Sequence, residues 1–246
     1  MKNWKQTKIG KFIDQYHLIY LAIPFCLWGV KALFYNIAIW IEPVSITFQH
    51  TIDSYIPFIK YFVIFYLVYY YLPQFVLWIL SFFDKKKYWI ILCSLGLCVL
   101  VCFLFYLAYN VRMERQPGYP NGIGLKDIKD VSTFFDYLIN WVYLKDPHAM
   151  NCFPSLHAVV GMMLVFIGFS IPFDRKKRAL LPFRIVVILC GLGCILSTIF
   201  IKQHYFMDMI AGVILAIMSY GVVTLCFWLL EKRKARKSCI SPTEEV

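Results

Sequence analysis

Residues 88–110 read YWIILCSLGLCVLVCFLFYLAYN, an apolar run without a charged side chain. A helix of about 20 residues crosses the hydrocarbon core of a bilayer, which is ~30 Å thick, at ~1.5 Å per residue. The chain as a whole is 61% hydrophobic and 19% aromatic, whereas soluble domains are usually about 45–50% apolar. This excess falls in blocks of similar length. The sequence therefore predicts an all-α integral membrane protein with a single membrane domain, residues 1–246.

Six apolar segments predict a bundle of six transmembrane helices. They cover residues 16–40, 55–83, 88–110, 156–173, 184–203 and 205–230. Lys31 interrupts the first segment, which is long and lacks a following cleavage site, so we expect it to remain in the mature protein. The second segment is long for one span and contains Lys60 and Pro73, so we expect it to tilt or kink.

Basic residues predict the orientation of the bundle. Four clusters hold 17 of the 25 lysines and arginines, and these clusters lie on alternate connections. By the positive-inside rule both termini are cytoplasmic, and residues 231–246 form a basic cytoplasmic tail. The net charge of +11 then reflects topology and attraction to anionic lipids at the cytoplasmic face, and we expect no binding to nucleic acid.

This orientation places residues 111–155, the longest polar connection, on the outer face. Residues 132–143 within it are rich in aromatic side chains and could lie as a short helix at the membrane interface. The connection ends in NCFPSLHA, residues 151–158. Pro154 can begin a helix and Ser155 can cap it, and the free N–H groups of a helix start attract phosphate. The alternative is a capped helix with an interfacial histidine, His157.

A second stretch on the predicted outer face is STIFIKQHYFMD, residues 197–208. His204 and Asp208 are four residues apart, so they would face the same side of one helix. An aspartate inside an apolar helix is costly and usually marks a functional partner. Its carboxylate can accept from one imidazole nitrogen and leave the other unprotonated and nucleophilic. The alternative is that Asp208 only satisfies a polar contact between helices.

Together, the order P-S-L-H and then S-T-x5-H-x3-D resembles the second and third signature motifs of the type 2 phosphatidic acid phosphatase superfamily. That superfamily includes haloperoxidase relatives and lipid phosphotransferases. The resemblance covers about residues 105–230. It implies that His204 attacks phosphorus and forms a phosphohistidine, that Asp208 orients His204, and that His157 acts as general acid and base. It also implies that Ser155 and nearby N–H groups stabilise the phosphoryl oxygens and that no metal or other cofactor is needed.

The sequence departs from the family motifs at several positions. The first motif is K-x6-R-P, and the nearest candidate for it is the stretch from Arg112 to Pro117. If Arg115 is the motif arginine, Ala108 stands where the lysine would be, and the proline is displaced by one residue. In the third motif Thr198 replaces the usual arginine. We hypothesise that Lys202, four residues on, supplies part of the missing charge. Arg112 and Arg115 are candidates for a phosphate clamp, since arginine suits phosphate geometry, although both could be solvated loop residues.

The resemblance implies a lipid phosphatase that hydrolyses a lipid phosphate or diphosphate at the outer face, with the protein expected in the plasma membrane and its substrate in the bilayer. Residues 111–155 would then bear part of the active site. A phosphotransferase that forms a phosphodiester headgroup, similar to inositol phosphorylceramide synthases, remains open, since the acceptor is not visible in the sequence. A non-catalytic lipid-binding or transport protein is the third alternative, although the intact trio of His157, His204 and Asp208 argues against it. The sequence does not predict an oligomeric state.

Overall fold

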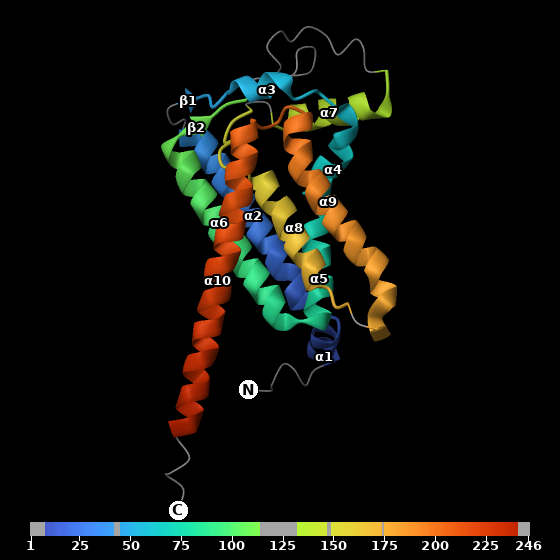
Figure 1. Ribbon diagram of the computed structural model, residues 1–246, viewed down its shortest axis with the longest axis vertical. Helices are drawn as coiled ribbons and strands as arrows, with labels where there is room; N and C mark the ends of the chain where they lie inside the picture. The colour runs from blue at the N-terminus through green and yellow to red at the C-terminus, as the bar shows by residue number, and fades with distance from the viewer. Residues whose placement is uncertain (1–7, 42–44, 114–131, 147–148, 174, 241–246) are drawn as a thin grey trace, which may run out of the picture.

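The computed structural model describes residues 8–41, 45–113, 132–146, 149–173 and 175–240, and these are almost entirely helical (Figure 1). The first half of the chain forms α1 (Lys8–Gln15), α2 (Leu18–Ile41), β1 (Ser45–Ile46), α3 (Thr51–Tyr55), α4 (Val63–Val68), α5 (Leu72–Phe83), α6 (Lys85–Ala108) and β2 (Asn110–Val111). The second half forms α7 (Phe134–Lys145), α8 (Leu156–Ser170), α9 (Leu181–Phe200) and α10 (Phe206–Ile240). Short 3₁₀ helices at Lys60–Phe62 and Arg175–Leu180 precede α4 and α9.

Four of the described helical segments are long and apolar enough to cross a membrane: Leu18–Ile41, Lys85–Ala108, Arg178–Phe200 and Phe206–Arg236. A fifth candidate is the pair Lys60–Val68 and Leu72–Phe83, which is bent by 43°. The remaining predicted span, α8, has only 15 residues and is shorter than a full crossing. The helical membrane fold is therefore confirmed with four or five candidate spans, while six spans and cytoplasmic termini stay predictions.

The bend in the second span follows from local sequence, as expected. Pro73 lies in the first turn of α5, where a missing N–H costs nothing, and α4 ends before it. Residues 69–71 form a turn at the break, with the N–H of Tyr69 bonded to the carbonyl of Tyr66. The break allows α4 to lean against α7 and α9, and it leaves Tyr66 and Tyr69 near the middle of the bundle.

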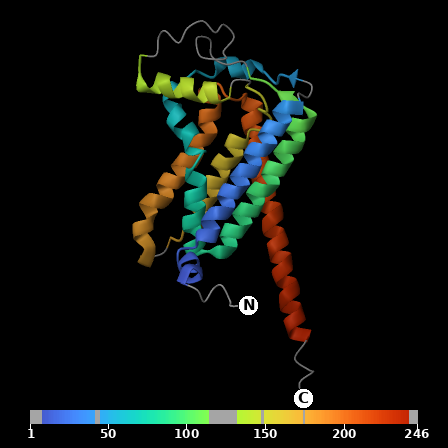
Figure 2. The same ribbon diagram turned by 180° about the vertical axis from the view of Figure 1, so that it is seen from behind.

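Helix α8 lies at the centre of the bundle, between α6, α9 and α10 (Figures 1 and 2). Ser155 caps its start by accepting from the N–H of Ala158 at 3.3 Å, as predicted. The helix ends at Ser170, because Pro172 disfavours helical backbone in the residue before it, Ile171. The surrounding core is built from large apolar side chains such as Leu80, Ile91 and Leu164.

One end of the bundle is covered by α3, α7 and the two-residue parallel pair β1–β2 (Figure 1). The short helix expected near residues 132–143 is present as α7, capped by Thr133 and tied to Lys60 through an ion pair of 2.8 Å with Asp136. Helix α1 and the basic half of α10 lie at the opposite end of the bundle. Helix α10 continues to Ile240, so the described part of the predicted basic tail is helical.

Candidate active site

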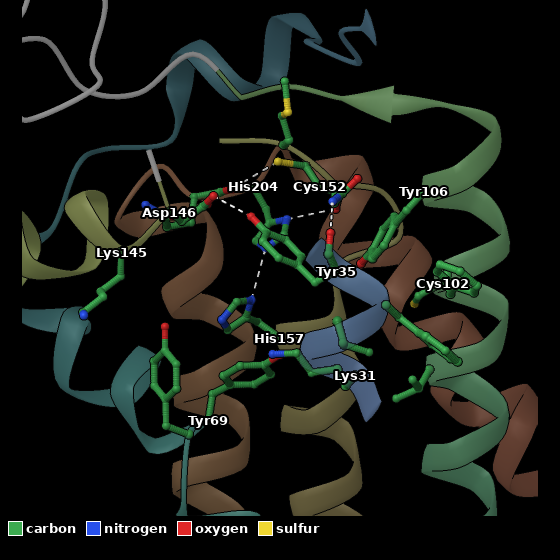
Figure 3. Close-up of a pocket in the computed structure, with 18 of the residues that line it drawn as sticks. Lys31, Tyr35, Tyr69, Cys102, Tyr106, Lys145, Asp146, Cys152, His157 and His204 are labelled. Atoms are coloured by element: carbon green, nitrogen blue, oxygen red, sulfur yellow. Dashed lines mark hydrogen bonds between the residues drawn. The ribbon is translucent and has the colours of Figure 1, made fainter. Parts of the chain in front are cut away.

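A cavity of about 130 Å³ opens at the end of the bundle that α3 and α7 cover (Figure 3). Its wall combines residues from α2, the α4–α5 break, α6, the end of α7, the loop before α8 and the turn before α10. His157 and His204, predicted as catalytic from two separate motifs, both line it. Lys145, Asp146 and residues 150–152 also line it, so the connection 111–155 contributes to the cavity.

His204 is held on the tight turn between α9 and α10 by backbone contacts. The N–H groups of Gln203 and His204 both lie 3.0 Å from the carbonyl of Thr198. The Nδ1 of His204 lies 2.9 Å from the carbonyl oxygen of Cys152. A carbonyl can only accept, so Nδ1 carries the proton and the Nε2 lone pair is exposed to the cavity.

His157 faces that lone pair from the first turn of α8. Its Nδ1 lies 3.4 Å from the Nε2 of His204. The His157 ring is packed between Tyr66 and Tyr69, with ring centroids 4.1 Å and 3.8 Å away. Its Nε2 is buried without a hydrogen-bond partner among the described residues. Such an atom is costly unless a water or a ligand satisfies it.

Asp208 does not contact His204 in the predicted way. Its Oδ2 lies 3.8 Å from His204 Nδ1, beyond hydrogen-bond distance, and instead accepts from the N–H of Tyr205 at 2.9 Å. The expected shared helix face does not exist, because α10 begins at Phe206 and His204 lies before it. Asp208 therefore caps α10 and can stabilise a charged His204 only through space.

Ser155 is fully buried and serves the backbone of the site. Its hydroxyl caps α8, and its N–H donates to the carbonyl of Asp208 at 3.0 Å. This contact ties the start of α8 to the first turn of α10. The hydroxyl is not part of the described cavity wall, so a direct phosphate contact of Ser155 stays a prediction.

Of the predicted phosphate-binding cations, the two that the structure describes, Lys202 and Arg112, do not line the cavity. Lys202 follows the end of α9, so it does not share a helix face with Thr198. Its amine donates to the carbonyls of Asp53 and Ile56 at 3.0 and 2.6 Å. Burial lowers the pKa of this ammonium group, and the Asp53 carboxylate opposes that shift. Arg112 is exposed after β2 and lies outside the cavity wall, and Arg115 falls outside the described residues.

Sequence reasoning missed the side chains that α2 and the α4–α5 break bring to the cavity. Lys31 lines it, with its amine 2.8 Å from the hydroxyl of Tyr69. The available signal was the charge itself, since a lysine inside an apolar span is a functional candidate by default. Tyr66 and Tyr69 had no such signal within an aromatic-rich segment.

Cys152, His204 and Asp208 also offer ligand atoms that lie within 4.8 Å of one another. Binding a metal through Nδ1 of His204 would require the loss of the proton that bonds the Cys152 carbonyl. The protonated Nδ1 fits a free imidazole nucleophile better than a metal ligand.

The fold and the site define a helical membrane protein with two facing histidines at one end of its bundle. The family model of the PAP2 superfamily matches residues 121–232, which confirms the resemblance drawn from the two motifs. Residues 121–232 thus match a superfamily whose members are generally phosphatases or phosphotransferases, and the long apolar helices are those of an integral membrane protein. No curated protein and no solved structure matches the chain. Lys31, Tyr66 and Tyr69 lie outside the matched segment.

Proposed function

We propose that the protein hydrolyses a lipid phosphate or diphosphate through a phosphohistidine on His204. The observation that carries this proposal is the pair of facing nitrogens, His204 Nε2 and His157 Nδ1, at 3.4 Å in the cavity wall. A nucleophile beside a proton-transfer partner splits one difficult displacement into two easier steps. Phosphatidic acid, phosphatidylglycerol phosphate and a polyprenyl diphosphate are candidate substrates.

In the first step the His204 Nε2 lone pair bonds to phosphorus as the bond from phosphorus to the leaving oxygen breaks. His157 gives its Nδ1 proton to that oxygen. In the second step His157 removes a proton from water, the water oxygen bonds to phosphorus, and the phosphorus–nitrogen bond breaks to release phosphate. The substrate occupies the space between the two rings, so their direct contact opens on binding.

The proposal places the reaction on the extracytoplasmic face of the plasma membrane. The cavity lies at the end of the bundle opposite Lys85–Lys87 and the basic residues 232–236 (Figure 1). Clusters of this kind mark the cytoplasmic side of membrane proteins. An alkylating or proteolytic reagent that does not cross membranes would test this orientation on engineered cysteines or tags at the two ends.

The experiment that tests the function is phosphate release in detergent with EDTA, measured on a panel of the three lipid classes. We expect wild-type protein and a His50→Ala control to release phosphate, because His50 is exposed away from the cavity wall. We expect His204→Ala to release none. Activity that disappears with EDTA would contradict the metal-independent mechanism, and folded wild-type protein without release from any lipid would contradict hydrolysis.

A second candidate is a phosphotransferase, in which an alcohol takes the place of water. The polar groups beside the histidines favour it, since Tyr35 donates to Asp146 at 2.5 Å and Asn151 lines the same cavity. Such hydroxyl, carboxylate and amide groups can bind a polyol. Adding glycerol or inositol to the assay distinguishes the two, because a transferase forms the phosphate monoester of the added alcohol at the expense of free phosphate. With a phosphodiester lipid as donor, the histidine carries an esterified phosphoryl group and the same transfer forms a phosphodiester headgroup.

A further inference from the structure

Lys31 is a charged side chain in the middle of a membrane span. It lies in α2, one of the described helices that are long and apolar enough to cross a bilayer. An ammonium group at this depth costs free energy unless something compensates for it. Lysines near helix ends usually extend to the interface, but Lys31 instead points into the cavity beside His157 (Figure 3).

The contacts of Lys31 are aromatic and neutral. Its amine donates to the Tyr69 hydroxyl at 2.8 Å and lies 4.3 Å from the centre of the Trp28 ring. Among the described residues no carboxylate lies within 4.0 Å of it. Aromatic rings orient an ammonium group but do not neutralise it, and Asp146, a carboxylate on the same cavity wall, attracts the amine only from beyond 4.0 Å, so the charge of Lys31 is incompletely compensated.

Lys31 also lies next to the position that an anion bound at the histidines would occupy. Tyr69 contacts both groups, since its hydroxyl bonds the Lys31 amine and its ring packs on His157 with centroids 3.8 Å apart. Toward the bundle interior, Lys31 borders a second, apolar cavity of about 20 Å³ lined by residues such as Leu77 and Ile167. The amine therefore lies at the boundary between the polar site and the apolar core.

The two predicted cations that the structure describes, Lys202 and Arg112, leave this role open. Thr198 stands where the family motif has arginine, and its hydroxyl is bonded to the carbonyl of Ile195. Lys202 is bonded to loop carbonyls, and Arg112 lies outside the cavity wall. We propose that Lys31 binds the phosphoryl oxygens of the substrate from the membrane side, in place of the missing arginine. This inference rests on the proposed function for the identity of the anion.

The test measures oxyanion binding separately from turnover. Purified wild-type, Lys31→Met, Lys31→Arg and Lys86→Met proteins are titrated with orthovanadate, a mimic of the phosphoryl transition state, and assayed for KM, kcat and thermal stability. Lys86 is a matched control because it is exposed and paired with Glu231 at the other end of the bundle. We expect Lys31→Met to weaken binding roughly 10- to 100-fold, the worth of one charge-assisted hydrogen bond, and to raise KM.

Lys31→Arg should restore binding to within about tenfold of wild type, since it keeps the charge. Lys31→Met should melt no lower than wild type, because removing a charge from an apolar span relieves its cost. Unchanged vanadate affinity in Lys31→Met would overturn the proposal. A large drop in melting temperature in both Lys31→Met and Lys31→Arg would overturn it as well. If the wild type binds vanadate but turns over no lipid phosphate, the proposed function is refuted. The vanadate affinities of wild type and the Lys31 variants then decide the role of Lys31 without any turnover measurement.

Discussion

The two walls of the cavity are positioned by different means. The histidine wall, formed by Cys152, His157 and His204, is held by the backbone: carbonyls of Cys152 and Thr198 fix His204, and the capped start of α8 fixes His157. The aromatic wall, formed by Lys31, Tyr66 and Tyr69, is held by side-chain stacking and one hydroxyl contact.

Under the proposed function, this difference separates the groups that set the reaction geometry from those that would recognise the substrate. Backbone contacts survive most substitutions, so the histidine wall keeps its nitrogens in place while nearby side chains change. Side-chain contacts change with every substitution, so the aromatic wall can be adapted to a new headgroup. The histidine wall lies in the family-matched segment, and the aromatic wall lies outside it.

The largest effect should come from His204, the proposed nucleophile on the histidine wall. We expect His204→Gln to lower turnover by at least about 1,000-fold, because loss of a nucleophile removes the covalent pathway. Wild-type protein quenched with a radiolabelled lipid phosphate should carry an acid-labile label that the variant lacks. A label of equal size on the variant would assign the intermediate to another residue.

Asp208→Asn should have a smaller effect than the loss of an imidazole-bound carboxylate in a catalytic triad, which costs about 10,000-fold. The tautomer of His204 is fixed here by the Cys152 carbonyl, and Asp208 Oδ2 lies 3.8 Å from Nδ1. We expect a loss of roughly 100-fold in kcat from weaker stabilisation of charged His204. A loss of 10,000-fold or more would show that Asp208 bonds the imidazole directly during turnover.

The spacing of the histidine wall depends on a close crossing of α8 and α9. A Cβ on Gly161 would lie 2.8 Å from the carbonyl oxygen of Gly191, and Gly161 is one turn from His157. We expect Gly161→Ala to destabilise the protein by about 1–3 kcal/mol through overpacking and to lower kcat roughly tenfold.

Gly96→Ala in α6 is the control for this crossing, since nothing lies within 4 Å of its added carbon. Melting curves and phosphate release of the two variants should differ. Equal behaviour would mean that the helix crossing does not set the distance between the two rings.

The smallest effect should come from Lys202, whose amine donates to the carbonyls of Asp53 and Ile56 at the end of α3, outside the cavity. We expect Lys202→Met to change KM less than about threefold, far less than Lys31→Met, because the two hydrogen bonds that it loses do not reach the cavity. Steady-state kinetics on the same lipid would decide the ranking. The reverse order of the two lysines would restore Lys202 as the phosphate-binding cation.

Features that depend on neighbouring residues could be predicted from the sequence, and features that depend on helix rotation could not. The Ser155 cap, the break before Pro73 and the position of both histidine motifs at the same end of the bundle follow from local patterns. The predicted position of Lys202 was wrong because α9 ends at Phe200, so the helical spacing from Thr198 does not extend to Lys202. The Cys152 carbonyl carries no side-chain signature, and the direction in which Lys31 points depends on how α2 packs.

Helix α8 has 15 residues, a length of about 22 Å at 1.5 Å per residue, while the hydrocarbon core is about 30 Å thick. With Ser170 at one boundary of the core, His157, 13 residues away along α8, lies about 10 Å below the opposite boundary. For the proposed reaction, a lipid phosphate would have to sink below the headgroup plane to reach His204, or the bilayer would have to thin around the bundle. Acyl-chain length therefore becomes a determinant of rate, and the same lipid headgroup should react faster in thin membranes than in thick ones.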